Sequence, residues 1–179
     1  NMFRTKPYPE VVFQGELLKV AEAIKDKDRD RILALGRKLD NIDQTGKWGI
    51  TLLMFAAFDS NPVGAKALIE LKADPGIEAP NLGNAAYIAV NRKSTDALKA
   101  MLEAGMSPNI HYSNQSIIFQ VPPLNANDAL TVLVEFGADI NARDPVGRTF
   151  LVDQISTSYD ECLYLLEQGA DPEIITYGG

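Results

Sequence analysis

The sequence has few of the side chains on which most enzymes and metal sites depend. Cys162 is the only cysteine and His111 the only histidine in 179 residues. One cysteine excludes an internal disulfide and a thiolate metal cluster. A Ser-His-Asp triad or a Cys-His dyad would need His111, which has no partner pattern beside it. Calcium-loop spacings and phosphate-binding glycine loops are absent too. The sequence therefore predicts no catalytic residue, no metal ion and no cofactor.

Long apolar runs and an excess of basic residues are also missing. No stretch approaches the roughly eighteen consecutive apolar residues of a membrane-spanning helix, and no signal peptide is visible in the sequence. The formal net charge of -7 argues against a nucleic-acid partner, because phosphate contacts need a basic face. The charge run from Lys25 to Arg31 alternates in sign, which is typical of a solvated connection between two helices. The oligomeric state stays open.

What the sequence does contain is a repeated segment, clearest at Leu133 to Ala142 (LVEFGADINA). Related segments place a pivot residue at Lys38, Lys72, Gly105, Gly137 and Gly169, which are 34, 33, 32 and 32 residues apart. A period in this range indicates supersecondary units stacked in a row. The hydrophobic content of 46% is sufficient for a continuous core through such a stack.

Apolar spacing inside each period predicts two short helices. In the first period a helix begins at Gly15, and a second helix follows a cap at Asp28 or Asp30. In the second period a short apolar helix covers Gly49 to Ala57, and Pro62 suits the first turn of the helix after it. In the third period we expect a helix over Gly83 to Val90, then a cap at Ser94 to Asp96 and a second helix.

The later periods deviate from this pattern in ways that carry physical meaning. A helix that begins at Ile117 is stopped early by Pro122-Pro123, which opens room for a loop of a binding partner. The last period starts its first helix near Phe150, and its second helix is expected to turn four side chains inward: Cys162, Leu163, Leu165 and Leu166. Cys162 shares the phase of Leu98 and Leu130 in earlier periods, which favours a core position over a nucleophile.

Taken together, these residues resemble ankyrin repeats. Gly49 to Ala57 is similar to the first half of the family pattern, Asp144, Gly147 and Thr149 match it again, and Gly137 to Asn141 matches the closing half. The resemblance implies an all-α repeat solenoid of about five repeats with hairpin-like turns and degenerate terminal caps. The approximate repeats are 15–44, 45–78, 79–111, 112–143 and 144–175, after an extended lead-in over 1–14; the tail from Ile174 to Gly179 is expected to fray.

The resemblance also implies a binding surface, since ankyrin stacks hold proteins on a concave face formed by the turn tips and the ends of the first helices. In phase with the family, the residues expected on that face are Lys47, Trp48, Ile50, Phe58, Asp59, Asn81, Asn84, Arg92, Lys93, Tyr112, Asn114 and Arg148. Trp48 is the strongest candidate, because it is the only tryptophan and tryptophan is enriched at binding hot spots. The alternative is that Trp48 packs against the lead-in or a neighbouring turn, and that Phe58 and Tyr112 pack between repeats.

The expected function is therefore non-catalytic protein binding. The segment Trp48 to Ala57 and the degenerate repeats are similar to small bacterial ankyrin proteins, some of which are immunity proteins for secreted phospholipase-type toxins of the kind delivered by type VI secretion. That likeness implies steric block of the toxin's active-site entrance or of its membrane-docking surface, and a periplasmic location with a removed signal. The alternative is a general scaffold or regulatory protein with another protein partner, in the cytoplasm.

Overall fold

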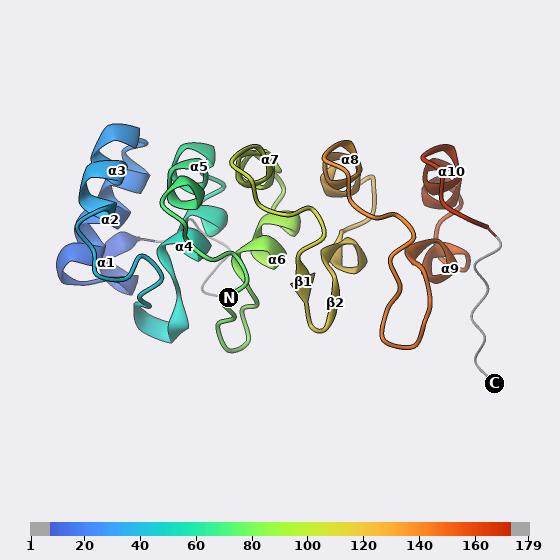
Figure 1. Ribbon diagram of the computed structural model, residues 1–179, viewed down its shortest axis with the longest axis horizontal. Helices are drawn as coiled ribbons and strands as arrows, with labels where there is room; N and C mark the ends of the chain where they lie inside the picture. The colour runs from blue at the N-terminus through green and yellow to red at the C-terminus, as the bar shows by residue number, and fades with distance from the viewer. Residues whose placement is uncertain (1–7, 173–179) are drawn as a thin grey trace. The chain divides into compact units, whose positions relative to one another are not determined.

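The computed structural model describes residues 8–172 and is built from short helices with one small β-hairpin (Figure 1). The expected fraying of the tail falls outside the described residues. The elements in chain order are α1 Pro9–Val12, α2 Gly15–Lys25, α3 Arg29–Gly36, the 3-10 helix η1 Lys47–Gly49, α4 Leu52–Phe58, α5 Pro62–Glu70, α6 Ala85–Val90, α7 Asp96–Glu103, β1 His111–Tyr112, β2 Gln115–Ser116, the 3-10 helix η2 Ile117–Gln120, α8 Ala129–Glu135, α9 Phe150–Gln154 and α10 Tyr159–Glu167. The chain forms two compact units, unit 1 (Asn1–Met106) and unit 2 (Ser107–Gly179).

Helix starts in unit 1 are set by polar caps. Asp28 accepts a hydrogen bond from the Arg31 amide at 3.1 Å and caps α3, as predicted. Thr51 caps α4 by accepting from the Met54 amide at 3.1 Å, so α4 begins later than the sequence pattern suggested at Gly49. A capping side chain satisfies one of the amides that the first helical turn leaves without a partner. The predicted start of α4 was therefore wrong by about one turn, because the capping hydrogen bond of Thr51, and not the apolar pattern, determines where the helix begins.

The core of unit 1 lies between two rows of helices, α2, α4 and α6 in one row and α3, α5 and α7 in the other (Figure 1). Helix α4 is buried along its whole length, which is typical of a helix covered on all sides. The last part of the lead-in belongs to this core and is not extended: α1 forms one helical turn, and Phe13 packs edge-on against Phe55 with ring centroids 5.5 Å apart. A Cβ at Gly64 would lie 2.7 Å from Ile24 Cγ2, so glycine permits the close approach of α2 and α5.

The core of unit 2 is smaller and consists of Ile118, Leu130, Phe150, Leu151, Leu165 and Ala170. Its first helix is the single 3-10 turn η2, which ends at Gln120 before Pro122-Pro123, as the sequence predicted. Cys162 packs against this core, where burial and then the charge of Glu161 raise the pKa of its thiol. A raised pKa keeps the thiol protonated and weakly nucleophilic.

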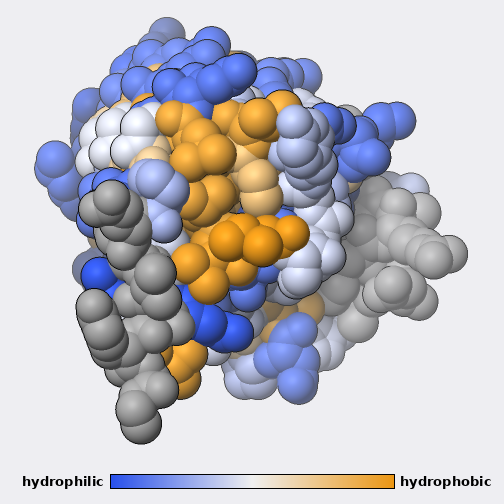
Figure 2. Space-filling view, turned by 90° about the vertical axis from the view of Figure 1, so that its right-hand side faces the viewer, coloured by the Kyte–Doolittle hydropathy of each residue, from blue (hydrophilic) through white to orange (hydrophobic). Residues whose placement is uncertain are grey.

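Two leucines of α10 do not point inward as expected. Leu163 and Leu166 are 40% and 43% exposed, and Ile155, just past α9, is 68% exposed. Figure 2 shows apolar side chains gathered on the face that α9 and α10 present. Within the described residues no further helix covers this face. Leu163 and Leu166 are therefore exposed, although the pattern of the earlier repeats predicted that they point inward.

The helix ends repeat one backbone motif. After α5, Lys72 has a φ of 68°, its amide donates to Ile69 O at 2.9 Å, and the Ala73 amide donates to Leu68 O at 3.0 Å. This is the Schellman arrangement, which needs a left-handed residue just past the helix. Gly105, Gly137 and Gly169 occupy the same place with φ between 89° and 109°. Lys72 thus adopts a left-handed conformation that the later repeats give to glycine.

Consecutive turns are tied to one another by side chains. Within each turn a polar residue accepts from the amide two residues on, as when Asp139 Oδ1 accepts from the Asn141 amide at 2.9 Å. In three of these turns the second residue also accepts a hydrogen bond from an amide of the next turn: Asn109 from Asp139 at 2.7 Å and Asn141 from Asp171 at 2.9 Å in unit 2, and Asp43 from Asp74 at 2.9 Å in unit 1. The turn at Asp74 has no such tie, because its second residue is Gly76. The Asp-x-Asn pattern of the repeats thus consists of a turn-forming residue followed by a tie to the neighbouring turn.

Replacing Lys72 by glycine is expected to stabilise the protein. The change removes the steric cost of a Cβ in the left-handed region, about 1 kcal/mol, and for a chain of this size that raises the melting temperature by about 2–4 °C. Lys99→Gly is the control, since Lys99 is exposed inside α7 and glycine there costs about 1 kcal/mol. Thermal melts in which Lys72→Gly is less stable than wild type would refute the account of this helix end.

Replacing Asp43 by asparagine is expected to stabilise the protein at neutral pH. Burial raises the pKa of the Asp43 carboxyl, the hydrogen bond from the Asp74 amide lowers it, and the charge of Asp74 raises it further. Because the net shift is upward, the folded state loses stability as pH rises through that pKa, and the gain from asparagine is complete only above it.

The measurement is a set of thermal melts from about pH 4 to pH 7, with Asp40→Asn as the control for an exposed carboxylate in the same segment. Asparagine already occupies the equivalent acceptor positions 109 and 141. A gain that does not shrink toward acid pH would contradict the role given to the buried charge.

Candidate functional site

Trp48 lies at the tip of the first turn in unit 1 and is 44% exposed. Its backbone has φ 57° and ψ 20°, a left-handed conformation that bulky residues rarely adopt. The turn is closed by hydrogen bonds from the Ile50 amide to Lys47 O at 3.1 Å and from the Gly46 amide to Ile50 O at 2.8 Å. Ile50 itself is 1% exposed and anchors the turn in the core. The turn therefore holds a large aromatic side chain at the surface at a conformational cost.

The second turn of unit 1 presents Asn81 in the same backbone conformation. Asn81 has a φ of 62° and is exposed, and the Ala79 amide donates to Gly83 O at 2.9 Å across the turn. Asparagine tolerates the left-handed region better than most residues. The tip of this turn therefore displays the exposed side-chain amide of Asn81.

The first turn of unit 2 is a true β-hairpin. β1 pairs with β2 so that Tyr112 lies opposite Gln115. Ser113 and Asn114 between them both have positive φ, 54° and 63°, which is the signature of a type I′ turn. Asn114 is exposed at its tip and Tyr112 is half-buried. The predicted hairpin-like turn is confirmed here.

The second turn of unit 2 is organised by the carboxylate of Asp144. One oxygen accepts from the amides of Val146 and Arg148 at 3.0 and 2.8 Å, and the other accepts from Arg148 Nε at 2.9 Å. Burial opposes ionisation of this carboxyl, but the hydrogen bonds and the Arg148 charge outweigh it and hold the pKa below its usual value. Arg148 remains half exposed while it is tied to its own turn.

Four of the expected contact residues do not lie on the surface. Ile50, Phe58, Asp59 and Asn84 are all buried. Asp59 pairs with Lys25 at 2.9 Å and accepts from Asn61 Nδ2, and Asn84 caps α6 by accepting from the Tyr87 amide at 2.8 Å. Their roles are internal, so the structure corrects their assignment to the binding face.

The remaining candidates are at least partly accessible. Lys47, Trp48, Asn81 and Lys93 are exposed in unit 1, and Arg92 is half-buried beside Lys93. In unit 2 the accessible candidates are Tyr112, Asn114 and Arg148. We refer to these eight residues as the accessible set.

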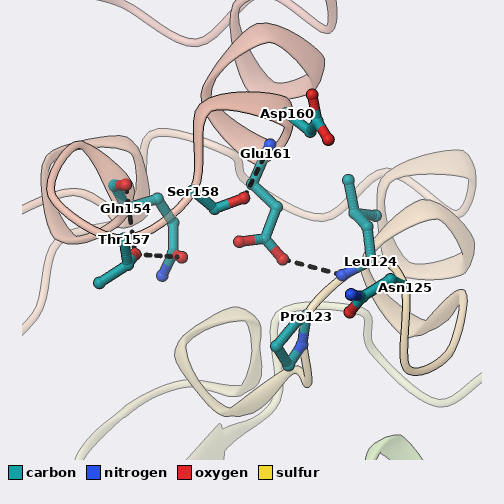
Figure 3. A pocket seen from close by; sticks show the side chains of 8 residues that line it. All are labelled: Pro123, Leu124, Asn125, Gln154, Thr157, Ser158, Asp160 and Glu161. Atoms are coloured by element: carbon teal, nitrogen blue, oxygen red, sulfur yellow. Dashed lines mark hydrogen bonds between the residues drawn. The ribbon is translucent and has the colours of Figure 1, made fainter.

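Unit 2 also contains a pocket whose lining residues are not among the twelve predicted contact residues. It has a volume of about 320 Å³ and lies between the segment after η2 and the start of α10 (Figure 3). We name it the α10 pocket; its lining residues are Pro123, Leu124, Asn125, Gln154, Thr157, Ser158, Asp160 and Glu161. The sequence did predict that Pro122-Pro123 shortens the preceding helix and opens room there, and three of the lining residues directly follow Pro122.

The missed residue of this pocket is Glu161. It follows Ser158 by three positions, the spacing of a capping box in which the acid turns back to the cap residue. Ser158 does accept from the Glu161 amide at 3.3 Å. The Glu161 carboxylate, however, accepts from the Leu124 amide at 2.9 Å instead of closing the box. The sequence carried the capping signal but no sign of this second partner.

The described part of the chain contains neither a candidate metal-binding cluster nor a candidate membrane-spanning helix. Residues 8–172 contain no group of three or more His, Cys, Asp or Glu side chains placed to hold a metal ion. No helix in the same range has the length and apolar character needed to cross a membrane.

Comparison with known proteins gives a fold. No protein-family model matches the chain. The crystal structure of EF0377, an ankyrin repeat protein, resembles it with a TM-score of 0.68 at 23% identity, over 90% of this chain and 86% of that one. The chain is also 28% identical over 185 residues to the ADP-ribosylation factor GTPase-activating protein AGD4 of Arabidopsis thaliana, covering 98% of this chain and 23% of that protein. The chain thus has an ankyrin-repeat fold and spans about a quarter of its curated relative.

Proposed function

We propose that the protein is a non-catalytic binding module for another protein and that Trp48 is the principal contact of unit 1. The observation that carries the proposal is the backbone of Trp48, a tryptophan held left-handed and 44% exposed at a turn tip. Strained conformations of this kind cost about 1–3 kcal/mol and cluster at functional sites. Asparagine or glycine would adopt that backbone with less strain.

The fold is a second reason to propose protein binding. Ankyrin-repeat folds generally serve as binding scaffolds, and function in such a fold lies in its surface residues. The accessible set combines an aromatic anchor with amide and basic side chains, a composition found at protein interfaces. GTPase activation is not proposed, because the match to the Arabidopsis protein covers only 23% of that protein.

The narrower version of the proposal is an immunity protein that covers the active-site entrance of a secreted phospholipase-type toxin. This version is supported by the resemblance of the segment from Trp48 to Ala57 to small bacterial ankyrin proteins. The fold suits binding, and steric block of a toxin requires no catalytic residue. The broader alternative is a scaffold that assembles other proteins. The identity of the partner separates the two versions, so the partner must be isolated before its affinity is measured.

Replacing Trp48 by alanine is expected to weaken partner binding by about 2 kcal/mol or more, roughly thirty-fold in Kd. The wild-type protein serves as bait on lysate and secreted fractions, each captured protein is identified by mass spectrometry, and its affinity is measured by calorimetry. Trp48→Asn is a second variant that suits the left-handed turn, so loss of binding with retained stability separates recognition from folding.

Tyr159→Ala is the matched control, since it truncates an aromatic side chain that is 76% exposed and belongs to α10, not to a turn tip. A partner that binds wild type and both Trp48 variants equally would contradict the proposal. A captured lipase-type enzyme whose activity falls on binding would support the immunity version, and a partner of any other class would reject that version.

A further inference from the structure

We propose that the α10 pocket receives a basic side chain, lysine in preference to arginine, from a partner polypeptide, with the Glu161 carboxylate as its acceptor. The inference rests on the proposed protein-binding function and adds a specific contact on unit 2.

Glu161 is a buried carboxylate without a cation. Its side chain belongs to a residue that is 4% exposed, and no lysine, arginine or histidine of the described residues forms an ion pair with it. One oxygen, Oε1, accepts from the Leu124 amide at 2.9 Å. Burying a carboxylate is costly unless a counter-charge compensates it. Within the described residues, no cationic side chain is paired with Glu161.

The second carboxylate oxygen faces open space. Figure 3 shows Glu161 in the middle of the labelled side chains, with one oxygen hydrogen-bonded to the Leu124 nitrogen and no hydrogen bond from the other labelled residues to the second oxygen. That oxygen is not among the sealed polar atoms of the described residues, so it can be reached from the pocket. A donor that enters the pocket would meet this oxygen first.

Local structure explains why an acid is kept at this place. Glu161 lies in the first turn of α10, where Ser158 caps the helix, and the positive end of the helix dipole favours a negative charge there. The bond to Leu124 fixes the carboxylate on the segment that follows Pro122-Pro123. The acceptor is thus held in position before any ligand arrives.

The charge of unit 2 selects a cation over an anion. Residues 107–179 contain 2 basic and 10 acidic side chains, a net charge of -8, whereas residues 1–106 contain 15 basic and 14 acidic ones, a net charge of +1. No lysine follows Lys99. A field of one sign raises the rate at which ligands of the opposite sign arrive. The pocket itself includes the carboxylates of Asp160 and Glu161 and no basic side chain.

The shape of the acceptor favours lysine. Arginine binds best to a carboxylate that offers both oxygens, and one oxygen of Glu161 is already bonded. The compact ammonium of lysine needs a single acceptor point. Pro123 and Leu124 on the pocket wall suit the aliphatic stem of such a side chain.

The test is a titration of the isolated protein with Nα-acetyl-lysine-N-methylamide, followed by NMR of the Leu124 and Glu161 backbone amides. The neutral analogue made from norleucine has the same stem without the charge. We expect saturable shifts of both amides with the lysine probe, no saturable shift with norleucine, and weaker binding of the corresponding arginine probe. Saturation by norleucine at the same concentration, or no saturation by either basic probe, would overturn the proposal.

Glu161→Gln removes the charge and keeps an acceptor for the Leu124 amide, and it is expected to weaken lysine-probe binding at least about fivefold. Glu167→Gln, an equal charge change at an exposed position on α10, is expected to bind as wild type. A purely structural role for Glu161 would lower the melting temperature of Glu161→Gln, whereas an unpaired buried charge predicts no loss or a gain. Equal probe binding by Glu161→Gln and wild type would also refute the assignment.

The outcome is separable from that of the Trp48 experiment. Trp48→Ala is expected to bind the lysine probe like wild type, because the α10 pocket lies wholly in unit 2. If no partner depends on Trp48, a positive titration still supports the pocket. If a partner depends on Trp48 but the titration fails, only the pocket assignment is lost.

Discussion

The tie between consecutive turns is the interaction on which the repeat arrangement depends. A side-chain oxygen of one turn accepts the backbone amide of the next, 31 residues on from Asp43 and 30 residues on from Asn109 and Asn141. Helix packing alone leaves such turns with amides that no secondary structure satisfies. The tie satisfies these amides and sets the spacing at which the turns follow one another within each unit.

Turns fixed in this way can hold exposed side chains on left-handed backbone, which is costly for tryptophan and better tolerated by asparagine. Trp48, Asn81 and Asn114 all have positive φ and all lie exposed at tips, while buried neighbours such as Ile50 hold the chain from below. The cost at each tip is small beside the burial of apolar helix surface in the same unit. Stability and recognition therefore fall on different residues of the same repeat, and substitutions at the tips are expected to change binding more than folding.

The sequence was sufficient for the repeat period, the helix pairs, a cap at Asp28 or Asp30 and the stop at Pro122, because each follows from local chemistry or a period of apolar residues. It was not sufficient for Ile50, Asp59 and Asn84. A position in the repeat places a residue near a tip, but only the backbone conformation of that turn decides whether its side chain points into the core. Glu161 was missed for a related reason, since its partner Leu124 is 37 residues away in the sequence.

Hydrogen exchange of the Asp139 amide tests the central claim most directly. In wild type this amide donates to the Asn109 side chain of the preceding turn, so we expect its exchange to be slowed as strongly as that of helix amides in α8. In Asn109→Ala the Asp139 amide should exchange at least about tenfold faster while the Leu133 amide keeps its protection. An Asp139 amide that exchanges freely in wild type, or one that is unaffected by Asn109→Ala, would contradict the claim that side-chain ties between turns hold the repeats in place.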